Sequence, residues 1–372
     1  MFKIFLGETF DDTVSPVYYS THAGIENNQP PGTAITGMSG AGKTFLLNYI
    51  NAMNTYAQAT CRLIDCKNDL SRIFNLTELT NIKLIKVNDP SQHGMLDPFR
   101  VELTTGYYNI SKKRWVSLEP SEIIANRVEL VTATVTFLMQ NLDQEQRTFV
   151  SALANDTINE YGEEASMSHL ISKMRFSKKA SSGASLISTG EDLERMSKRS
   201  ASKALFADPD TPLPPRSKTG DGMTEIYSLM GLDFSNSDPS SVDSRIARAV
   251  FFITANQLKE LMLREATTRP QIIVIDEAWA ILGNPEGRKL IATIGRLARS
   301  RNTALILGTQ RYADLKGKGG EEDVLSYMSQ HIALRPGIDD VKDTAEALNV
   351  PHVEVARLAQ AVDVKGAAIF KD

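Results

Sequence analysis

The feature that most constrains this chain is the run GMSGAGKT at residues 37–44, which matches the phosphate-loop pattern G-x-x-x-x-G-K-[ST] at every fixed position. Residues 31–36 precede it as a short buried strand entered from a turn, and residues 45–50 continue it with helical spacing. Because the pattern carries meaning only between a strand and a helix, this context favours a phosphate site. The alternative is a glycine-rich turn that binds nothing.

The residue types of the loop suit phosphate chemistry. Glycines let backbone N–H groups approach the β-phosphate without a Cβ in the way, and the following helix turns its positive N-terminal end toward the same phosphates. We expect Lys43 to bridge the β- and γ-phosphates of ATP and Thr44 to ligate Mg²⁺. The predicted nucleotide contacts are Gly37, Ser39, Gly40, Ala41, Gly42, Lys43, Thr44 and Phe45.

Composition narrows the class of protein only slightly. A length of 372 residues suggests one large or two modest globular domains. The net charge of −4 does not require a nucleic-acid partner, although a basic pore can lie inside an acidic ring. Cys61 and Cys66 are too few for a disulfide framework and are predicted to be reduced, buried thiols in the cytoplasm. The histidines are scattered without a metal-binding spacing.

The sequence shows no sign of a membrane segment. Its start reaches Gly7 and Glu8 too soon for the apolar core of a signal peptide. Its most apolar helix candidate, residues 128–139, is too short to span a bilayer. We therefore expect membrane association only through partners or through a segment that this sequence lacks.

The order of predicted elements indicates an α/β fold. Strands at 2–6, 16–20, 61–65 and 82–87, with a helix at 43–54, give the strand–helix layout of a parallel sheet. Helices are then expected from 119, from 143 (a capping box with Gln146) to 162, and at 168–174, with mobile connections at 177–202 and 208–222. Strands at 225–234, 271–277, 303–308, 331–334 and 367–370 follow, among helices at 241–264, before 301, 321–328, 341–348 and 353–360.

A second signature lies at 272–277, where four apolar residues end in Asp276 and Glu277. An acid at the carboxyl end of a core strand emerges where the phosphates lie. We expect Asp276 to orient Mg²⁺ through its water shell and Glu277 to polarise the attacking water. The alternative is a buried strand that ends in a solvated acidic turn.

The distance along the chain from Lys43 to Asp276 exceeds what a few strand–helix units of about 30 residues each require. A helical insertion at 104–221 accounts for the excess. The nucleotide-binding core is then predicted to be discontinuous, with residues 1–103 and 222–372 on either side.

Further candidates follow the acidic strand. Gln310, at the end of the next strand, is placed to sense the γ-phosphate, or else it caps a turn. In a ring of subunits, an arginine near the end of the intervening helix would reach a neighbour's nucleotide as an arginine finger. The alternative is that these arginines only form a solvated helix end, where cations are favoured. The candidates are Arg296, Arg299, Arg301 and, after a later strand, Arg335. The run at 65–69 either supports the metal or water or forms a solvated turn.

These motifs together resemble a known family. The phosphate loop, IDEAW at 275–279, ARSRN at 298–302 and GTQ at 308–310 occur in the order seen in the ATPase domain of TraC/TrbE-type conjugation ATPases of type IV secretion systems, within the FtsK–HerA superfamily. DPF at 97–99 and GAAIFKD at 366–372 are also similar to that group. Ser300 departs from the pattern, in which a basic residue stands beside the arginine, so the motif leaves open which arginine is the finger; Arg299 and Arg301 are the two that we include among the catalytic candidates.

The resemblance implies a RecA-like P-loop NTPase core with a mainly parallel sheet and an inserted all-helical subdomain. It implies a homo-oligomer, a hexamer when active, at the inner face of the cell membrane, with other type IV secretion components as partners and DNA or protein as the transported substrate. Family members carry a further N-terminal domain. Because this chain opens only a short way before the phosphate loop, we expect it to be part of a longer protein.

The resulting hypothesis is a Mg²⁺-dependent ATPase that powers conjugative type IV secretion or pilus assembly. One alternative is a DNA-pumping motor of the coupling-protein or HerA-like type. Another is a nucleotide-gated scaffold with little turnover, against which the intact Asp276 and Glu277 argue.

Overall fold

The computed structural model describes residues 2–10, 13–71, 81–109, 114–139, 142–177, 183–207, 222–234, 238, 240–264, 269–317, 321–361, 364 and 366–372. They fall into two compact units. The first comprises Met1–Ile85, Thr219–Ile226 and Ala266–Asp372, and the second comprises Lys86–Lys218 and Tyr227–Glu265. The division at 104 and 221 remains a prediction about domains.

The first unit contains the large sheet. Its elements are β1 (Ile4–Glu8), β2 (Pro16–Tyr19), α1 (Ala23–Glu26), β3 (Gly32–Thr36), α2 (Lys43–Tyr56), β4 (Thr60–Asp65), β5 (Ile82–Lys86), β8 (Thr224–Ser228), β9 (Gln271–Ile275), α8 (Trp279–Leu282), α9 (Pro285–Ala298), η5 (Arg299–Arg301), β10 (Thr303–Thr309), η6 (Tyr312–Asp314), η7 (Val324–Tyr327), β11 (Met328–Leu334), η8 (Ile338–Asp340), α10 (Val341–Leu348), α11 (His352–Gln360) and β12 (Ala368–Lys371). The last residues of β5 and β8 belong to the second unit.

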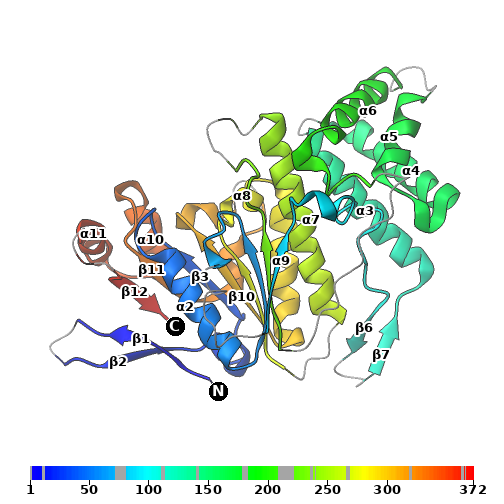
Figure 1. The fold of residues 1–372 in the computed structure, drawn as a ribbon. Helices are drawn as coiled ribbons and strands as arrows, with labels where there is room; N and C mark the ends of the chain where they lie inside the picture. The colour runs from blue at the N-terminus through cyan, green and yellow to red at the C-terminus, as the bar shows by residue number, and fades with distance from the viewer. Residues whose placement is uncertain are drawn as a thin grey trace. The chain divides into compact units, whose positions relative to one another are not determined.

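Eight strands form this sheet in the order β12-β11-β3-β10-β9-β4-β8-β5. Figure 1 labels β12, β11, β3 and β10 among them. β11, β3, β10, β9 and β4 pair in parallel, and β12 runs antiparallel to β11. The predicted α/β fold with a mainly parallel sheet is confirmed. Because parallel strands end at the same edge, the residues that follow β3, β10, β9 and β4 meet there.

The two faces of the sheet are covered by different helices. The connection from β3 through α2 to β4 crosses the sheet in one direction, whereas that from β9 through α9 to β10 runs in the other. Right-handed crossovers therefore place α2 and α9 on opposite faces. On the α2 side, Leu47 and Ile50 share one buried cluster with Val274 and Ile306. This packing fixes the start of α2, and with it Lys43, over the sheet edge.

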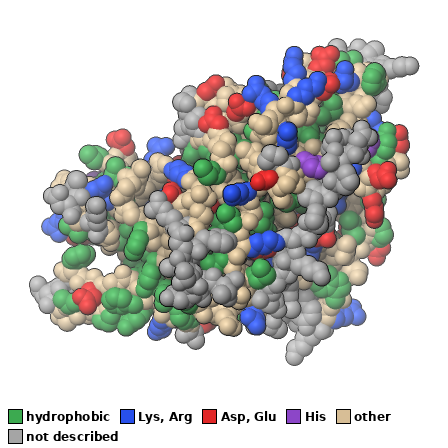
Figure 2. Space-filling model, in the orientation of Figure 1, with side chains coloured by type: hydrophobic (Ala, Val, Ile, Leu, Met, Phe, Trp, Pro, Cys, Tyr) green, Lys and Arg blue, Asp and Glu red, His purple; other side chains and the backbone are tan. Residues whose placement is uncertain are grey.

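A β1–β2 hairpin precedes the sheet strands along the chain. Phe5 and Tyr18 lie edge to face on it, with ring centroids 5.8 Å apart, and both side chains are exposed. Apolar side chains are visible over this hairpin at the lower left of Figure 2.

The second unit is mainly helical. Its elements are η2 (Pro90–Gln92), β6 (Gly106–Asn109), β7 (Arg114–Ser117), α3 (Pro120–Met139), α4 (Gln144–Tyr161), η3 (Gly162–Glu164), α5 (Met167–Arg175), α6 (Gly183–Ser197), η4 (Ser200–Ser202) and α7 (Val242–Arg264). The predicted capping box at Asp143 and Gln146 is confirmed at the start of α4. α3 packs against α7, where Phe137 stacks on Phe252.

Several element predictions need correction. Residues 177–202, predicted as a mobile connection, include the helix α6, because Leu186, Leu193 and Met196 recur at helical spacing and are buried among Ser, Lys and Arg. The antiparallel hairpin β6–β7 was not anticipated. β8 ends at Ser228, well before the predicted 234, and the predicted helix at 321–328 is only the 3-10 turn η7. Most of the connection predicted at 208–222 lies outside the described residues.

Among the described residues, none of the helices has both the length and the apolar character needed to cross a membrane.

Candidate active site

The phosphate loop joins β3 to α2, as predicted, and its glycines have conformations that other residues avoid. Gly40 has φ +81° and Gly42, which caps α2, has φ +102°. Both values lie in the left-handed region, where a Cβ would clash with the backbone. Gly37 is tight for another reason, since a Cβ there would lie 2.9 Å from Leu334 Cβ. Ser39 and Phe45 are exposed, Ala41 is buried and Thr44 is half-buried.

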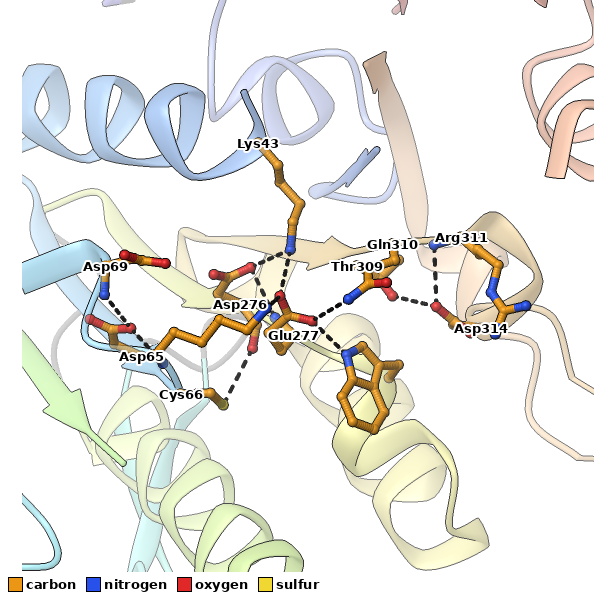
Figure 3. A network of polar contacts seen from close by, with 12 residues as sticks. Lys43, Asp65, Cys66, Asp69, Asp276, Glu277, Thr309, Gln310, Arg311 and Asp314 are labelled. Atoms are coloured by element: carbon orange, nitrogen blue, oxygen red, sulfur yellow. Dashed lines mark hydrogen bonds and ion pairs between the residues drawn. The ribbon is translucent and has the colours of Figure 1, made fainter. Parts of the chain in front are cut away.

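Lys43 and the acid pair come together at the sheet edge (Figure 3). Lys43 Nζ donates to Asp276 Oδ1 at 2.7 Å and to Glu277 Oε1 at 3.3 Å. All three side chains are almost fully buried. Burial alone would lower the pKa of Lys43, but the two carboxylates raise it above its ordinary value. The ammonium group is therefore charged and held where the strand ends meet.

Glu277 has a constrained backbone and a fully occupied carboxylate. Its φ is +54°, an unfavourable value for a residue with a long side chain. Oε1 accepts from Lys43 and from Lys67 Nζ at 2.6 Å, and Oε2 accepts from Trp279 Nε1 at 2.5 Å and Gln310 Nε2 at 3.5 Å. Burial opposes ionisation, but Lys43, Lys67 and Trp279 lower the pKa of Glu277 to about 2. Glu277 is therefore ionised, and its contacts fix the direction of its carboxylate. A residue that polarises water needs both properties.

The loop after β4 is organised by the Asp65 carboxylate. Its oxygens accept from the backbone N–H groups of Lys67, Asp69, Leu70 and Ser71 at 2.9–3.2 Å. Burial nevertheless raises the pKa of Asp65 above its ordinary value. The next residue, Cys66, is a buried free thiol, and Cys61 is another. Burial raises the pKa of both thiols above the ordinary value. The predicted buried free thiols are confirmed.

Close packing on the β10 side leaves no room beside Asp276. Gly308 accepts through its carbonyl from Ala278 N–H at 2.8 Å, and an added Cβ would lie 2.8 Å from Asp276 Oδ1. Thr309 Oγ1 donates to Asp314 Oδ2 at 2.6 Å, which fixes the turn that carries Gln310. β10 therefore positions both the metal-ligand candidate and the γ-phosphate sensor candidate.

Three of the arginine candidates lie apart from this cluster, and the fourth, Arg335, lies beside the phosphate loop. Arg299 and Arg301 precede β10, whereas Gln310 follows it, so seven strand residues at about 3.3 Å each separate the two ends. Arg299 donates to the Asn28 carbonyl and side chain, and Arg301 is buried. Arg296 pairs with Glu322. Arg335 follows β11, and its carbonyl accepts from Met38 N–H beside the phosphate loop. Arg299 and Arg301 thus lie at the opposite end of β10 from Gln310 and the acid pair.

Two contributors were missed in assigning roles from the sequence. The sequence includes Lys67 only in the run at 65–69 and Trp279 only in a family motif, without a role for either side chain. The structure brings both onto Glu277. The sequence carries a weak signal for the contact between Trp279 and Glu277. An indole N–H needs a hydrogen-bond acceptor when it is buried, and an acid lies two residues before Trp279.

A family model described as an AAA-like domain matches residues 20–356. The chain belongs to this AAA-like domain family.

Solved structures resemble this AAA-like domain over nearly its whole length. VirB4 of Thermoanaerobacter pseudethanolicus superposes with a TM-score of 0.73 at 16% identity, covering 99% of this chain and 95% of that one. The bacterial conjugative coupling protein TrwBdeltaN70, in a trigonal form with sulphate, superposes with a TM-score of 0.55 at 12% sequence identity. The match covers 93% of this chain and 83% of that one. The plasmid coupling protein TrwB in complex with the ATP analogue ADPNP superposes with a TM-score of 0.54 at 11% sequence identity. The match covers 93% of this chain and 78% of that one. No curated protein matches the sequence. At these identities the likenesses show a shared fold, which is the fold that the resemblance implied.

Proposed function

We propose that this AAA-like domain is a Mg²⁺-dependent ATPase that powers a conjugative type IV secretion system, in substrate transfer or pilus assembly. The observation that carries the proposal is the convergence of the phosphate-loop lysine on a buried Asp–Glu pair at the end of a core strand. The loop binds phosphate, and the acid pair is the part needed for hydrolysis.

Each side chain has a distinct role in this proposal. Lys43 would leave the acid pair to bridge the β- and γ-phosphates, and the loop backbone, with Ser39 and Phe45 beside it, would surround the nucleotide. Glu277 would orient and polarise water, and Gln310, which contacts the same carboxylate, would sense the γ-phosphate. Turnover would thus require Lys43 to be freed from the carboxylates.

The residues also suit Mg²⁺. Mg²⁺ prefers oxygen ligands, and Thr44 supplies a hydroxyl at the start of α2, the helix whose first residue contacts Asp276. Thr44 and Asp276 would hold the ion, Asp276 through its water shell. When bound, Mg²⁺ neutralises charge on the phosphates.

The assembly and setting are proposed from the resemblance. TrwB, which shares the fold, is a conjugative coupling protein and binds ADPNP, and VirB4 is similar over a larger share of its own chain. We propose a hexamer on the cytoplasmic side of the membrane, joined to other secretion components, with residues 104–221 as its helical insertion. Since Arg299 and Arg301 lie at the far end of β10, either would act only on a neighbour's nucleotide.

The test is ATP hydrolysis with Mg²⁺ across a range of protein concentrations. The wild type should turn over, with activity rising more steeply than linearly because a neighbour completes the site. Glu277→Gln should abolish turnover while ADPNP still binds, and Glu354→Gln, on the exposed face of α11, should behave as wild type. Undiminished hydrolysis by Glu277→Gln would overturn its role. Stimulation by duplex DNA, with strongly salt-dependent binding, would instead favour the DNA translocase.

A further inference from the structure

Two lysines share one oxygen of the catalytic carboxylate candidate. Lys43 Nζ lies 3.3 Å from Glu277 Oε1, and Lys67 Nζ lies 2.6 Å from the same atom. They come from different elements, α2 and the loop after β4. Because β4 neighbours β9, the residues after Asp65 reach those after Ile275. The second lysine is thus placed at the nucleotide edge by sheet order.

The loop that carries Lys67 is fixed, while its side chain is accessible. Asp65 binds the loop through four backbone N–H groups, including that of Lys67 itself. The Lys67 side chain is 52% exposed, against 8% for Lys43. A half-exposed ion pair contributes little to stability. Stability alone therefore does not account for a loop built to hold this ammonium group over Glu277.

Charge gives Lys67 a task once nucleotide binds. Lys43 would move to the β- and γ-phosphates, leaving Asp276 and Glu277 facing a terminal phosphate of negative charge. Like charges brought close together near a protein surface repel each other. The other groups on the Glu277 carboxylate, Trp279 and Gln310, are neutral. Among the described side chains that contact Glu277, Lys67 is then the remaining cation.

We propose that Lys67 is a second cation of the nucleotide site, which holds Glu277 in the absence of triphosphate and contacts the terminal phosphate when triphosphate binds. This inference rests on the proposed function. Its ligand is the γ-phosphate, so Lys67 would distinguish a triphosphate from a diphosphate, whereas the loop backbone and Lys43 would hold both. A lysine suits this exchange because its long, flexible stem carries a compact charge.

The experiment compares binding of Mg²⁺–ADPNP and Mg²⁺–ADP by the full chain. Lys67→Met should weaken ADPNP binding about tenfold to a hundredfold, as expected for a charge-assisted contact, and change ADP binding less than about twofold. Lys67→Arg should restore most of the ADPNP affinity. Lys342→Met, an exposed lysine of α10, is the matched control and should bind both as wild type does.

The outcomes separate the two proposals. Unchanged binding of both nucleotides by Lys67→Met, or equal weakening of both, would overturn the role of Lys67 while wild-type hydrolysis keeps the ATPase proposal intact. Failure of the wild type to bind either nucleotide would overturn the proposed function itself. Retained ADP binding also demonstrates that Lys67→Met is folded.

Discussion

The ammonium nitrogen of Lys43 lies 2.7 Å from Asp276 Oδ1, although the two residues are 233 positions apart in the chain. The contact is buried and also includes Glu277. The phosphate-loop lysine therefore bridges two adjacent carboxylates and offsets part of their negative charge. Its removal has consequences beyond the loss of phosphate binding.

Replacing Lys43 with Met should destabilise the nucleotide-free protein. Two neighbouring buried carboxylates would lose a shared cation, and breaking a buried pair by removing one partner costs about 3–5 kcal/mol. The free energy of unfolding should fall by about 3 kcal/mol in urea titrations. Lys67→Met, which removes a half-exposed partner, should lose under about 1 kcal/mol.

A second variant isolates the cause of that loss. Lys43→Met combined with Asp276→Asn removes one of the two opposing charges and should recover part of the lost stability. A double variant that is less stable than Lys43→Met alone would show that charge is not what destabilises the single variant.

Trp279 offers a test of how Glu277 is aimed. Trp279→Phe keeps an aromatic ring but removes the N–H that donates to Glu277 Oε2 at 2.5 Å. We expect kcat to fall about tenfold, with ADPNP affinity unchanged, because a donor that orients a catalytic group contributes about 1–2 kcal/mol. The other tryptophan, Trp115, is exposed on β7 in the second unit, and Trp115→Phe is the control. A loss of ADPNP affinity equal to the loss in kcat would contradict a role in catalysis alone.

Local pattern explains which parts of the site were predictable. The phosphate loop specifies its own strand, turn and helix, and four apolar residues before Asp276 specify a core strand with an acid at its end. Parallel strands share an edge, so Lys43 and Asp276 are expected at the same edge of the sheet. The sheet order does not follow from local pattern. Lys67 reaches Glu277 only because β4 lies next to β9, a pairing that no local pattern encodes.

Composition misled where packing decides. The stretch that contains α6 is rich in Ser, Lys and Arg, which favoured a connection. Its three buried apolar residues are spaced for one helix face, and tertiary burial outweighs the weak helix propensity of serine. The exposed position of Ser39 and the burial of Arg301 likewise depend on contacts distant in sequence.

Gly308 should be intolerant of a side chain. A Cβ there would lie 2.8 Å from Asp276 Oδ1, which also accepts from Lys43 and from Glu277 N–H at 2.9 Å. This oxygen cannot move without breaking both bonds, so Gly308→Ala should reduce hydrolysis by tenfold or more, about 1.4 kcal/mol in activation free energy. Gly337→Ala, where a Cβ meets open space, should behave as wild type. Full activity in Gly308→Ala would show that Asp276 has freedom to relocate.

The second unit contains a buried carboxylate with a different consequence. Asp97 is fully buried, and its oxygens accept from the N–H groups of Phe99 at 3.0 Å, Met167 at 3.0 Å and Ala207 at 3.1 Å. It thereby ties together three segments of that unit. Burial raises the pKa of Asp97 to about 6, against the opposing effect of these donors.

Because the folded pKa of Asp97 is raised, its contribution to stability is fully present below pH 3.8 and is lost as the pH rises through about 6. Asp97→Asn does not titrate and offers one acceptor oxygen to three N–H groups, so it should be less stable throughout. The stability advantage of the wild type over this variant should therefore shrink between pH 5 and pH 7, by about 1.4 kcal/mol per unit at most. Urea unfolding of both proteins across this range measures the difference between their free energies of unfolding. The other titrating groups are the same in both proteins, so their effects cancel in this difference. An advantage that is constant or grows with pH would show that Asp97 ionises at or below its ordinary pKa.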